Sequence, residues 1–281
     1  MQISDADLEK AIVRLKAAPP PRPDASVFLP DTDARPAGAT PASKLGEAYM
    51  SAVADTRASL EILNAPAARK SVLLERPAWS WMHQRDNSPL QVDIRVAAND
   101  SWVKLRHSSN SKFVNDFVYF YFYWANDTGR PALLDAYVPF VLTGNMQARA
   151  AGTFWGPQDP TYTHLNTSVR LMRNTGWGAD DGKFMPFTLN QIQDKFIHAN
   201  SKGRSLYRSG PSDTRHFDYQ SYHSTWYGAL IPSGASVFVT FIIQAYCAPN
   251  PAGRLDTLTH LEFYDGDHAV RIPYAFLTVA T

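Results

Sequence analysis

The sequence lacks most of the patterns that would point directly to a chemistry, beginning with cysteine. Cys247 is the single cysteine among 281 residues. One cysteine can form neither an internal disulfide nor a multi-cysteine zinc site. Cys247 lies in an apolar segment, and apolar burial raises the pKa of a thiol and so lowers its reactivity. We therefore expect a buried core thiol rather than a nucleophile.

Charged residues are also scarce, and the two signs are balanced. They make up 19% of the chain, and the formal net charge is +1. No run of lysine and arginine is present that could form the concentrated basic patch by which proteins neutralise nucleic-acid phosphates. We therefore expect no nucleic-acid partner.

Long apolar runs are missing as well. No stretch approaches the ~18 apolar residues that a membrane-spanning helix requires. The N-terminal sequence MQISDADLEK lacks the basic region followed by an apolar run that is typical of a signal peptide. These features predict a soluble protein without a transmembrane segment, cytoplasmic as synthesised, with leaderless export or incorporation in a particle left open.

The common catalytic motifs are absent too. The chain contains no phosphate-binding loop, no G-x-G-x-x-G, no G-x-S-x-G and no H-E-x-x-H. An enzyme is therefore the less favoured class, and we expect no cofactor.

What is present divides the chain into an extension over residues 1–66 and a main domain over residues 67–281. Ser4 can cap a first helix, and Pro41 occupies the first position of another, where its missing N–H costs nothing. The extension is expected to contain a helix over 4–17, a proline-rich arm over 18–40 and a helix over 41–63. Phe28 belongs to the one apolar patch of the arm, which makes it a candidate contact with another surface.

The main domain shows the two-residue period of half-buried strands. In the segment LQVDIRV, Leu90, Val92 and Ile94 alternate with polar residues. Roughly nine or ten such segments are separated by turn signals such as NDTG and IPSG, with no alternating helices. This pattern predicts a mainly β protein, an antiparallel β-sandwich with a jelly-roll-like connection of its strands.

The segment FVYFYFYW, residues 117–124, is apolar or aromatic at every position. Its even positions carry Val, Phe, Phe and Trp and should face the core, whereas Tyr119, Tyr121 and Tyr123 should form an outer face that is covered but tolerates hydroxyls. The segment ASVFVTFIIQAYC divides in the same way, and two such strands side by side would form an interaction surface. The protein's own helix over 41–63, a neighbouring copy or its arm, and a ligand such as a glycan are the three possible covers.

Two expected loops combine tryptophan with carboxylates. Trp177 stands beside Asp180 and Asp181 in NTGWGADDGK, and Trp155 stands near Asp159 in GTFWGPQD. Loops at the end of a sandwich often carry function. A ring that stacks on a sugar face, with carboxylates that accept hydrogen bonds from its hydroxyls, makes these five residues candidates for carbohydrate binding.

The densest group of titratable residues is in RHFDYQSYHSTWYG. His216 and Asp218 are spaced so that both could ligate a metal or act as an acid–base pair, and His223 follows closely. The alternative interpretation is that these are ordinary surface or hydrogen-bonded side chains.

A β-sandwich that follows a helix and a proline-rich arm resembles the plan of many jelly-roll assembly proteins, including phage and capsid-type subunits. The chain departs from many RNA-packaging coat proteins because its arm is not basic. The leading hypothesis is a non-enzymatic binding or assembly protein that forms a homo-oligomer through its arm and its tyrosine face. The alternatives are a lectin-like or toxin-type protein that binds a glycan or cell-surface receptor, and a metal-dependent hydrolase.

Overall fold

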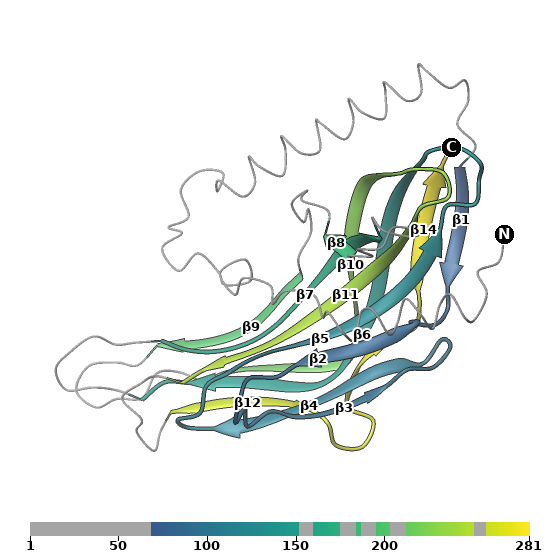
Figure 1. The fold of residues 1–281 in the computed structure, drawn as a ribbon. Helices are drawn as coiled ribbons and strands as arrows, with labels where there is room; N and C mark the ends of the chain where they lie inside the picture. The colour runs from purple at the N-terminus through teal and green to yellow at the C-terminus, as the bar shows by residue number, and fades with distance from the viewer. Residues whose placement is uncertain (1–68, 152–159, 175–183, 187–194, 203–211, 250–256) are drawn as a thin grey trace, which may run out of the picture.

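The protein folds as two antiparallel β-sheets packed face to face (Figure 1). The computed structural model describes residues 69–151, 160–174, 184–186, 195–202, 212–249 and 257–281. All regular elements in these ranges are strands, and all the strand pairings are antiparallel. The expectation of an antiparallel sandwich is confirmed. The predicted extension over residues 1–66, with Phe28, lies outside the described residues.

The larger sheet has eight strands. They are β1 (Arg69–Leu74), β3 (Gln91–Arg95), β4 (Ser101–Ser109), β6 (Ala132–Arg149), β10 (Asp213–Ile231), β12 (Leu258–Phe263), β13 (Ala269–Ile272) and β14 (Ala275–Ala280). Strand β6 organises this sheet, because β10 pairs along one of its edges while β14, β13 and β12 pair in turn along the other. Distant parts of the sequence therefore meet on the two sides of one long strand.

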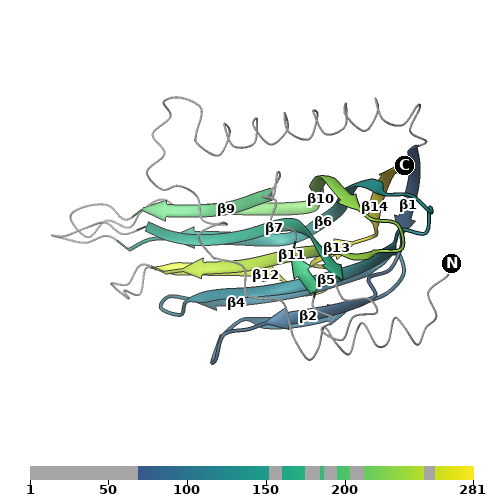
Figure 2. The same ribbon diagram turned by 45° about the horizontal axis from the view of Figure 1, so that its top comes forward.

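The smaller sheet has six strands. They are β2 (Trp79–His83), β5 (Val114–Ala125), β7 (Pro160–Asn174), β8 (Phe184–Pro186), β9 (Lys195–Lys202) and β11 (Ser236–Ala248). Strand β11 lies between β5 and β7, and β2 extends the sheet beyond β5. From β9 to β12 the chain alternates between the two sheets (Figure 2), which is the jelly-roll-like connection that the sequence predicts.

The core lies between the sheets and contains the side chains that the two-residue period assigns to it. Val118, Phe120 and Phe122 of β5 are almost fully buried there, as are Val239 and Phe241 of β11. The buried apolar area of such side chains is the main favourable term in folding. The single cysteine is also buried in this core, as expected, and burial raises the pKa of its thiol.

The described residues contain fourteen strands, more than the nine or ten expected. Short strands account for much of the difference: β1 and β2 precede the first segment with clear alternation, and β8 has only 3 residues. In addition, the final segment AVRIPYAFLTVA forms two strands, β13 and β14, because Pro273 stands between them and cannot donate to a strand ladder.

No helix in the described ranges has the length and apolar character needed to cross a membrane.

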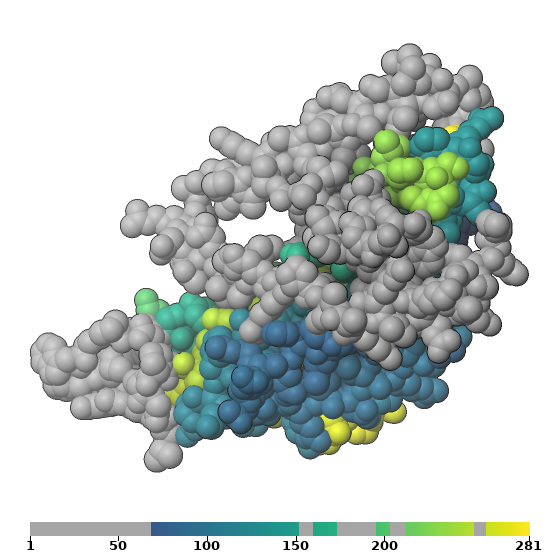
Figure 3. All heavy atoms as spheres, viewed as in Figure 1, coloured from purple at the N-terminus to yellow at the C-terminus, as the bar shows by residue number. Residues whose placement is uncertain are grey.

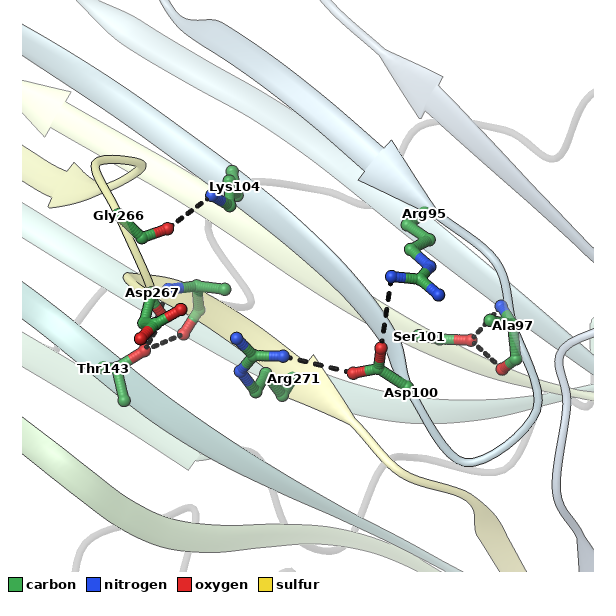
Figure 4. A network of polar contacts seen from close by, with 10 residues as sticks. Arg95, Ala97, Asp100, Ser101, Lys104, Thr143, Gly266, Asp267 and Arg271 are labelled. Carbon is green, nitrogen blue, oxygen red and sulfur yellow. Dashed lines mark hydrogen bonds and ion pairs between the residues drawn. The ribbon is translucent and has the colours of Figure 1, made fainter.

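The outer face of the larger sheet carries a network of polar contacts around the β3–β4 and β12–β13 turns (Figure 4). The Asp100 carboxylate forms two ion pairs, one from Oδ2 to Arg95 Nη1 at 3.3 Å and one from Oδ1 to Arg271 Nη1 at 3.1 Å. Lys104 Nζ donates to the carbonyl oxygen of Gly266 at 2.7 Å, and Thr143 Oγ1 donates to the carbonyl oxygen of Asp267 at 2.8 Å. Solvent-exposed ion pairs contribute little stability. They indicate instead that this part of the sheet faces water.

Gly144 is the residue of β6 that can least tolerate a side chain. It has a φ of 145°, and a Cβ there would lie 2.2 Å from the carbonyl oxygen of Glu262 and 2.8 Å from Cδ1 of Phe263. Gly144→Ala is therefore expected to push β12 away from β6 and to lower the free energy of unfolding by about 2–4 kcal/mol. Urea unfolding followed by tryptophan fluorescence measures this loss.

Gly266→Ala is the matched control for that substitution. Gly266 also has a positive φ, 59°, but no atom lies within 4 Å of its added Cβ. The control should lose only the ~1–2 kcal/mol of left-handed strain. Equal losses in the two variants would contradict the steric explanation.

Candidate functional site

The outer face of the smaller sheet is the candidate site, and strand pairing brings its side chains together. Strands β5 and β11 are adjacent, as the sequence pattern required for a continuous patch. Tyr121 lies between Trp79 of β2 and Thr240 of β11 in one row of the sheet, and the next row places Tyr119 beside Ile242. We call this surface the tyrosine face: Trp79, Trp81, Phe117, Tyr119, Tyr121, Tyr123, Met172, Phe238, Thr240 and Ile242.

Aromatic contacts join the side chains of this face. The rings of Trp79 and Tyr121 stack with their centroids 5.2 Å apart and an interplanar angle of 13°. The ring centroids of Trp81 and Tyr119 lie 5.4 Å apart. Tyr121 and Phe238 form an edge-to-face pair with their ring centroids 6.0 Å apart. Such pairs add to the energy of area burial and fix the rings in place. The face is therefore a preformed aromatic surface.

The tyrosine face is buried although neither described sheet places a strand over it. Tyr119 is 1% exposed, Tyr121 is 0% exposed and Thr240 is 1% exposed. Burial raises the pKa of Tyr121 far above its ordinary value. The hydroxyls of Tyr121 and Thr240 have no hydrogen-bond partner among the described residues, although buried hydroxyls normally have one. The face is thus buried rather than solvated.

Beyond the aromatic rows, the same face becomes polar, and hydrogen bonds join several of its side chains across the strands. Gln244 Nε2 donates to Asn115 Oδ1 at 2.8 Å, and Asn166 Nδ2 donates to Gln244 Oε1 at 2.8 Å. In the next row, His164 Nε2 donates to Asn200 Oδ1 at 2.7 Å. The face therefore has an apolar, aromatic end and a polar end.

His164 is the titratable group at the centre of the polar end. It is 0% exposed and stacks on Tyr246, with ring centroids 5.5 Å apart. Burial lowers the pKa of His164 to about 4, the hydrogen bond to Asn200 raises it in part, and the nearby His198 lowers it further. The ring is therefore neutral at physiological pH and becomes a buried cation only in acid.

The five residues of the predicted carbohydrate loops lie outside the described residues. These are Trp155, Asp159, Trp177, Asp180 and Asp181. Their carbohydrate-binding role stays a prediction.

The three candidate metal ligands are all exposed on β10, but the structure does not bring them together. His216 pairs with Asn145 and His223 with Pro139, six residues apart along β6 and hence ~20 Å apart. Asp218 lies between them in the sequence, at the β-bulge between Phe217 and Gln220. His223 instead stacks on Tyr137, with ring centroids 4.8 Å apart. Within the described ranges, no group of three or more His, Cys, Asp or Glu side chains is arranged to hold a metal.

The polar end of the face is the part that the sequence interpretation missed. The signal is present in β7, where His164 and Asn166 share one parity while Leu165, Val169 and Leu171 share the other. A strand with one core face and one face of buried polar groups has the same pattern as a strand that faces water. Only the neighbouring strands decide between them.

Comparisons with known proteins add no family. No protein-family model matches the chain, and no curated protein matches it. Among solved structures, a chain of the infectious bursal disease virus Gx strain structure matches 76% of this chain with 9% identity and a TM-score of 0.14. A chain of the VP2 subviral particle of the same virus matches 77% of it with 8% identity and a TM-score of 0.12. The chain spans about two fifths of the length of these structures, 40% and 41%. Scores this low carry no argument about fold or function.

Proposed function

We propose that the protein is a non-enzymatic subunit that self-associates, with the tyrosine face as its main contact surface and residues 1–66 as the segment that covers it. The burial of this face, without a described strand over it, carries the proposal. The covering segment is the subunit's own extension or that of a neighbour. Exchange of such extensions between copies would link subunits into an assembly.

The composition of the face supports association rather than exposure to water. Tryptophan, tyrosine, phenylalanine and methionine are enriched at protein interfaces, where charged residues are depleted. Trp79, Tyr121 and Phe238 are joined by stacked and edge-on contacts at its centre. Contiguous apolar surfaces of this kind are rarely left open on monomers. The solvated ion pairs on the other sheet (Figure 4) show the contrast within one molecule.

The test is the molar mass in solution with and without the extension. We expect light scattering to show an oligomer for the full chain and a smaller species for a variant that lacks residues 1–66. A second variant that lacks only residues 1–40 keeps the expected second helix. Its molar mass therefore shows whether the arm or that helix is needed for assembly. A monomeric full chain would contradict the proposal. So would an oligomer whose number of subunits is the same in the full chain and in both deletion variants.

A further inference from the structure

We propose that the proline-rich arm, residues 18–40, is the part of the extension that binds the centre of the tyrosine face, and that it binds as an extended chain. This inference rests on the proposed function, because it names the segment that covers the face and the chemistry by which the face recognises it. Tyr119 is 1% exposed and Tyr121 is 0% exposed, although neither described sheet places a strand over them.

A ladder of nearly parallel rings runs along β5 and continues onto β2. The ring centroids of Phe117 and Tyr119 lie 6.4 Å apart, with an interplanar angle of 29°. Those of Tyr119 and Tyr121 lie 6.2 Å apart at 14°, and Trp79 of β2 stacks on Tyr121 at 5.2 Å and 13°. Aromatic-lined surfaces bind proline-rich segments, because the preformed polyproline helix loses little entropy on binding. The ladder is a surface of this kind.

Two buried hydroxyls at the centre of the ladder favour an extended chain over a helix. Tyr121 and Thr240 lie directly opposite each other on β5 and β11, and their hydroxyls have no hydrogen-bond partner among the described residues. Buried hydroxyls normally have a partner. An α-helix uses its backbone carbonyls for its own hydrogen bonds, whereas a polyproline chain has no internal hydrogen bonds and leaves its carbonyls free. The arm can therefore accept from both hydroxyls, and the backbone of the helix expected over 41–63 cannot.

The arm also matches the face in charge. The tyrosine face consists of aromatic and aliphatic side chains, one methionine and one threonine, none of which is charged. A charge buried against it would lose its hydration without gaining a partner. The arm contains two uncharged stretches, three consecutive prolines at 19–21 and ASVFLP at 25–30. The second stretch includes Phe28, which gives the arm an aromatic side chain of its own.

The dimensions of the arm are compatible with this placement. The part of β5 from residue 117 to residue 123 spans ~20 Å at about 3.4 Å per residue. About seven residues of a polyproline helix, at ~3.1 Å each, cover that length. Residues 41–68, which join the arm to β1, span ~40 Å even where they are helical. The arm of the same subunit or of a neighbouring copy can therefore reach the face.

Disulfide trapping in the full chain locates the segment that covers Thr240. A disulfide requires the two Cα atoms to come within ~7 Å of each other. We expect Thr240→Cys to be trapped by Ser26→Cys or Phe28→Cys, and non-reducing electrophoresis shows whether the bond joins one chain or two. Tyr49→Cys, in the helix expected over 41–63, is the matched control and should stay reduced. The native Cys247 is 0% exposed and does not compete. Trapping by Tyr49→Cys alone, or by neither arm position, would overturn the inference.

Tyr121→Phe tests the hydrogen bond, because it removes the hydroxyl and keeps the ring. We expect chymotrypsin to cleave the arm after Phe28 about two- to tenfold faster in this variant, the effect of one lost hydrogen bond on the detached fraction. Tyr219→Phe is the control, because Tyr219 is 61% exposed on the larger sheet, and it should leave the rate unchanged. A cover that offers no acceptor predicts slower cleavage in Tyr121→Phe, since the variant then removes an unsatisfied buried group. An equal or slower rate would therefore contradict the inference.

These experiments separate the inference from the proposed function. An oligomer that becomes smaller without residues 1–66, but is trapped only by Tyr49→Cys, keeps the assembly and rejects the arm as the cover. A monomeric full chain in which Phe28→Cys traps Thr240→Cys within one chain rejects the assembly and keeps the arm. The unfolding midpoint of each variant shows that it has folded.

Discussion

Thr240→Lys is expected to break the assembly of the protein into smaller species. Thr240 is 1% exposed at the centre of the tyrosine face, between Tyr121 and Arg170 in its row of the sheet. A lysine there would bury an uncompensated charge beside an arginine. Such a charge costs about 3–5 kcal/mol, which corresponds to a weakening of association by at least ~100-fold. Light scattering across a dilution series measures the change.

Ser221→Lys is the matched control for this experiment. Ser221 is also a hydroxyl residue in a strand, but it is exposed on the larger sheet, where it pairs with Val141. The control should keep the molar mass and the unfolding midpoint of the parent protein. If Thr240→Lys also keeps both, the tyrosine face is not an interface. If it keeps the mass but lowers the midpoint, the cover is the subunit's own extension.

Acid is expected to destabilise the protein strongly between pH 6.5 and pH 4. Burial lowers the pKa of His164 to about 4, and burial and the nearby His260 lower the pKa of His107 to about 4. Both histidines are almost completely buried. In this pH window the unfolded chain binds protons at these sites and the folded chain does not, so the free energy of unfolding falls as the pH falls.

The size of this effect follows from the two pKa values of each histidine. A fall from 6.5 to about 4 corresponds to roughly 3 kcal/mol of stability per residue, present in full above pH 6.5 and lost by pH 4. Whole domains are stable by only ~5–15 kcal/mol. Urea unfolding at a series of pH values between 7.5 and 4 measures the loss.

His164→Gln separates this contribution from that of the carboxylates, which also titrate in acid. The variant should be less stable than the parent protein at pH 7.5 but should lose less stability on acidification, by roughly 3 kcal/mol. Leu165→Ala is the control, because it removes a fully buried side chain from the same strand without removing a proton-binding group. Parallel pH curves for His164→Gln and the parent protein would show that His164 does not carry the effect.

The sequence predicted most of the architecture because alternation is a local signal. Residues 117–124 and the odd positions from Val237 to Ala245 were assigned to the correct faces, and β5 and β11 proved to be neighbours. Short strands with weak alternation, such as β1 and β2, were missed. Trp79 therefore joined the tyrosine face only in the structure, where β2 pairs with β5.

The candidate sites were predictable to a smaller degree. The spacing of His216 and Asp218 suggested a metal site, but within the described ranges no group of three or more His, Cys, Asp or Glu side chains is arranged to hold a metal. Nothing near Tyr121 in the sequence indicates that Trp79 and Phe238 lie beside it, since the three residues come from different strands. A site assembled across strands leaves no local pattern.

The sequence by itself determined the class of fold, the two faces of each long strand and the burial of Cys247, because a period of two residues records which side of a sheet each residue occupies. Tertiary structure alone decided which strands are neighbours, where bulges interrupt the period, and therefore which side chains share a surface. Pairing joins segments distant in sequence, and a shift by one residue moves a whole strand to its opposite face. The tyrosine face is the product of that pairing.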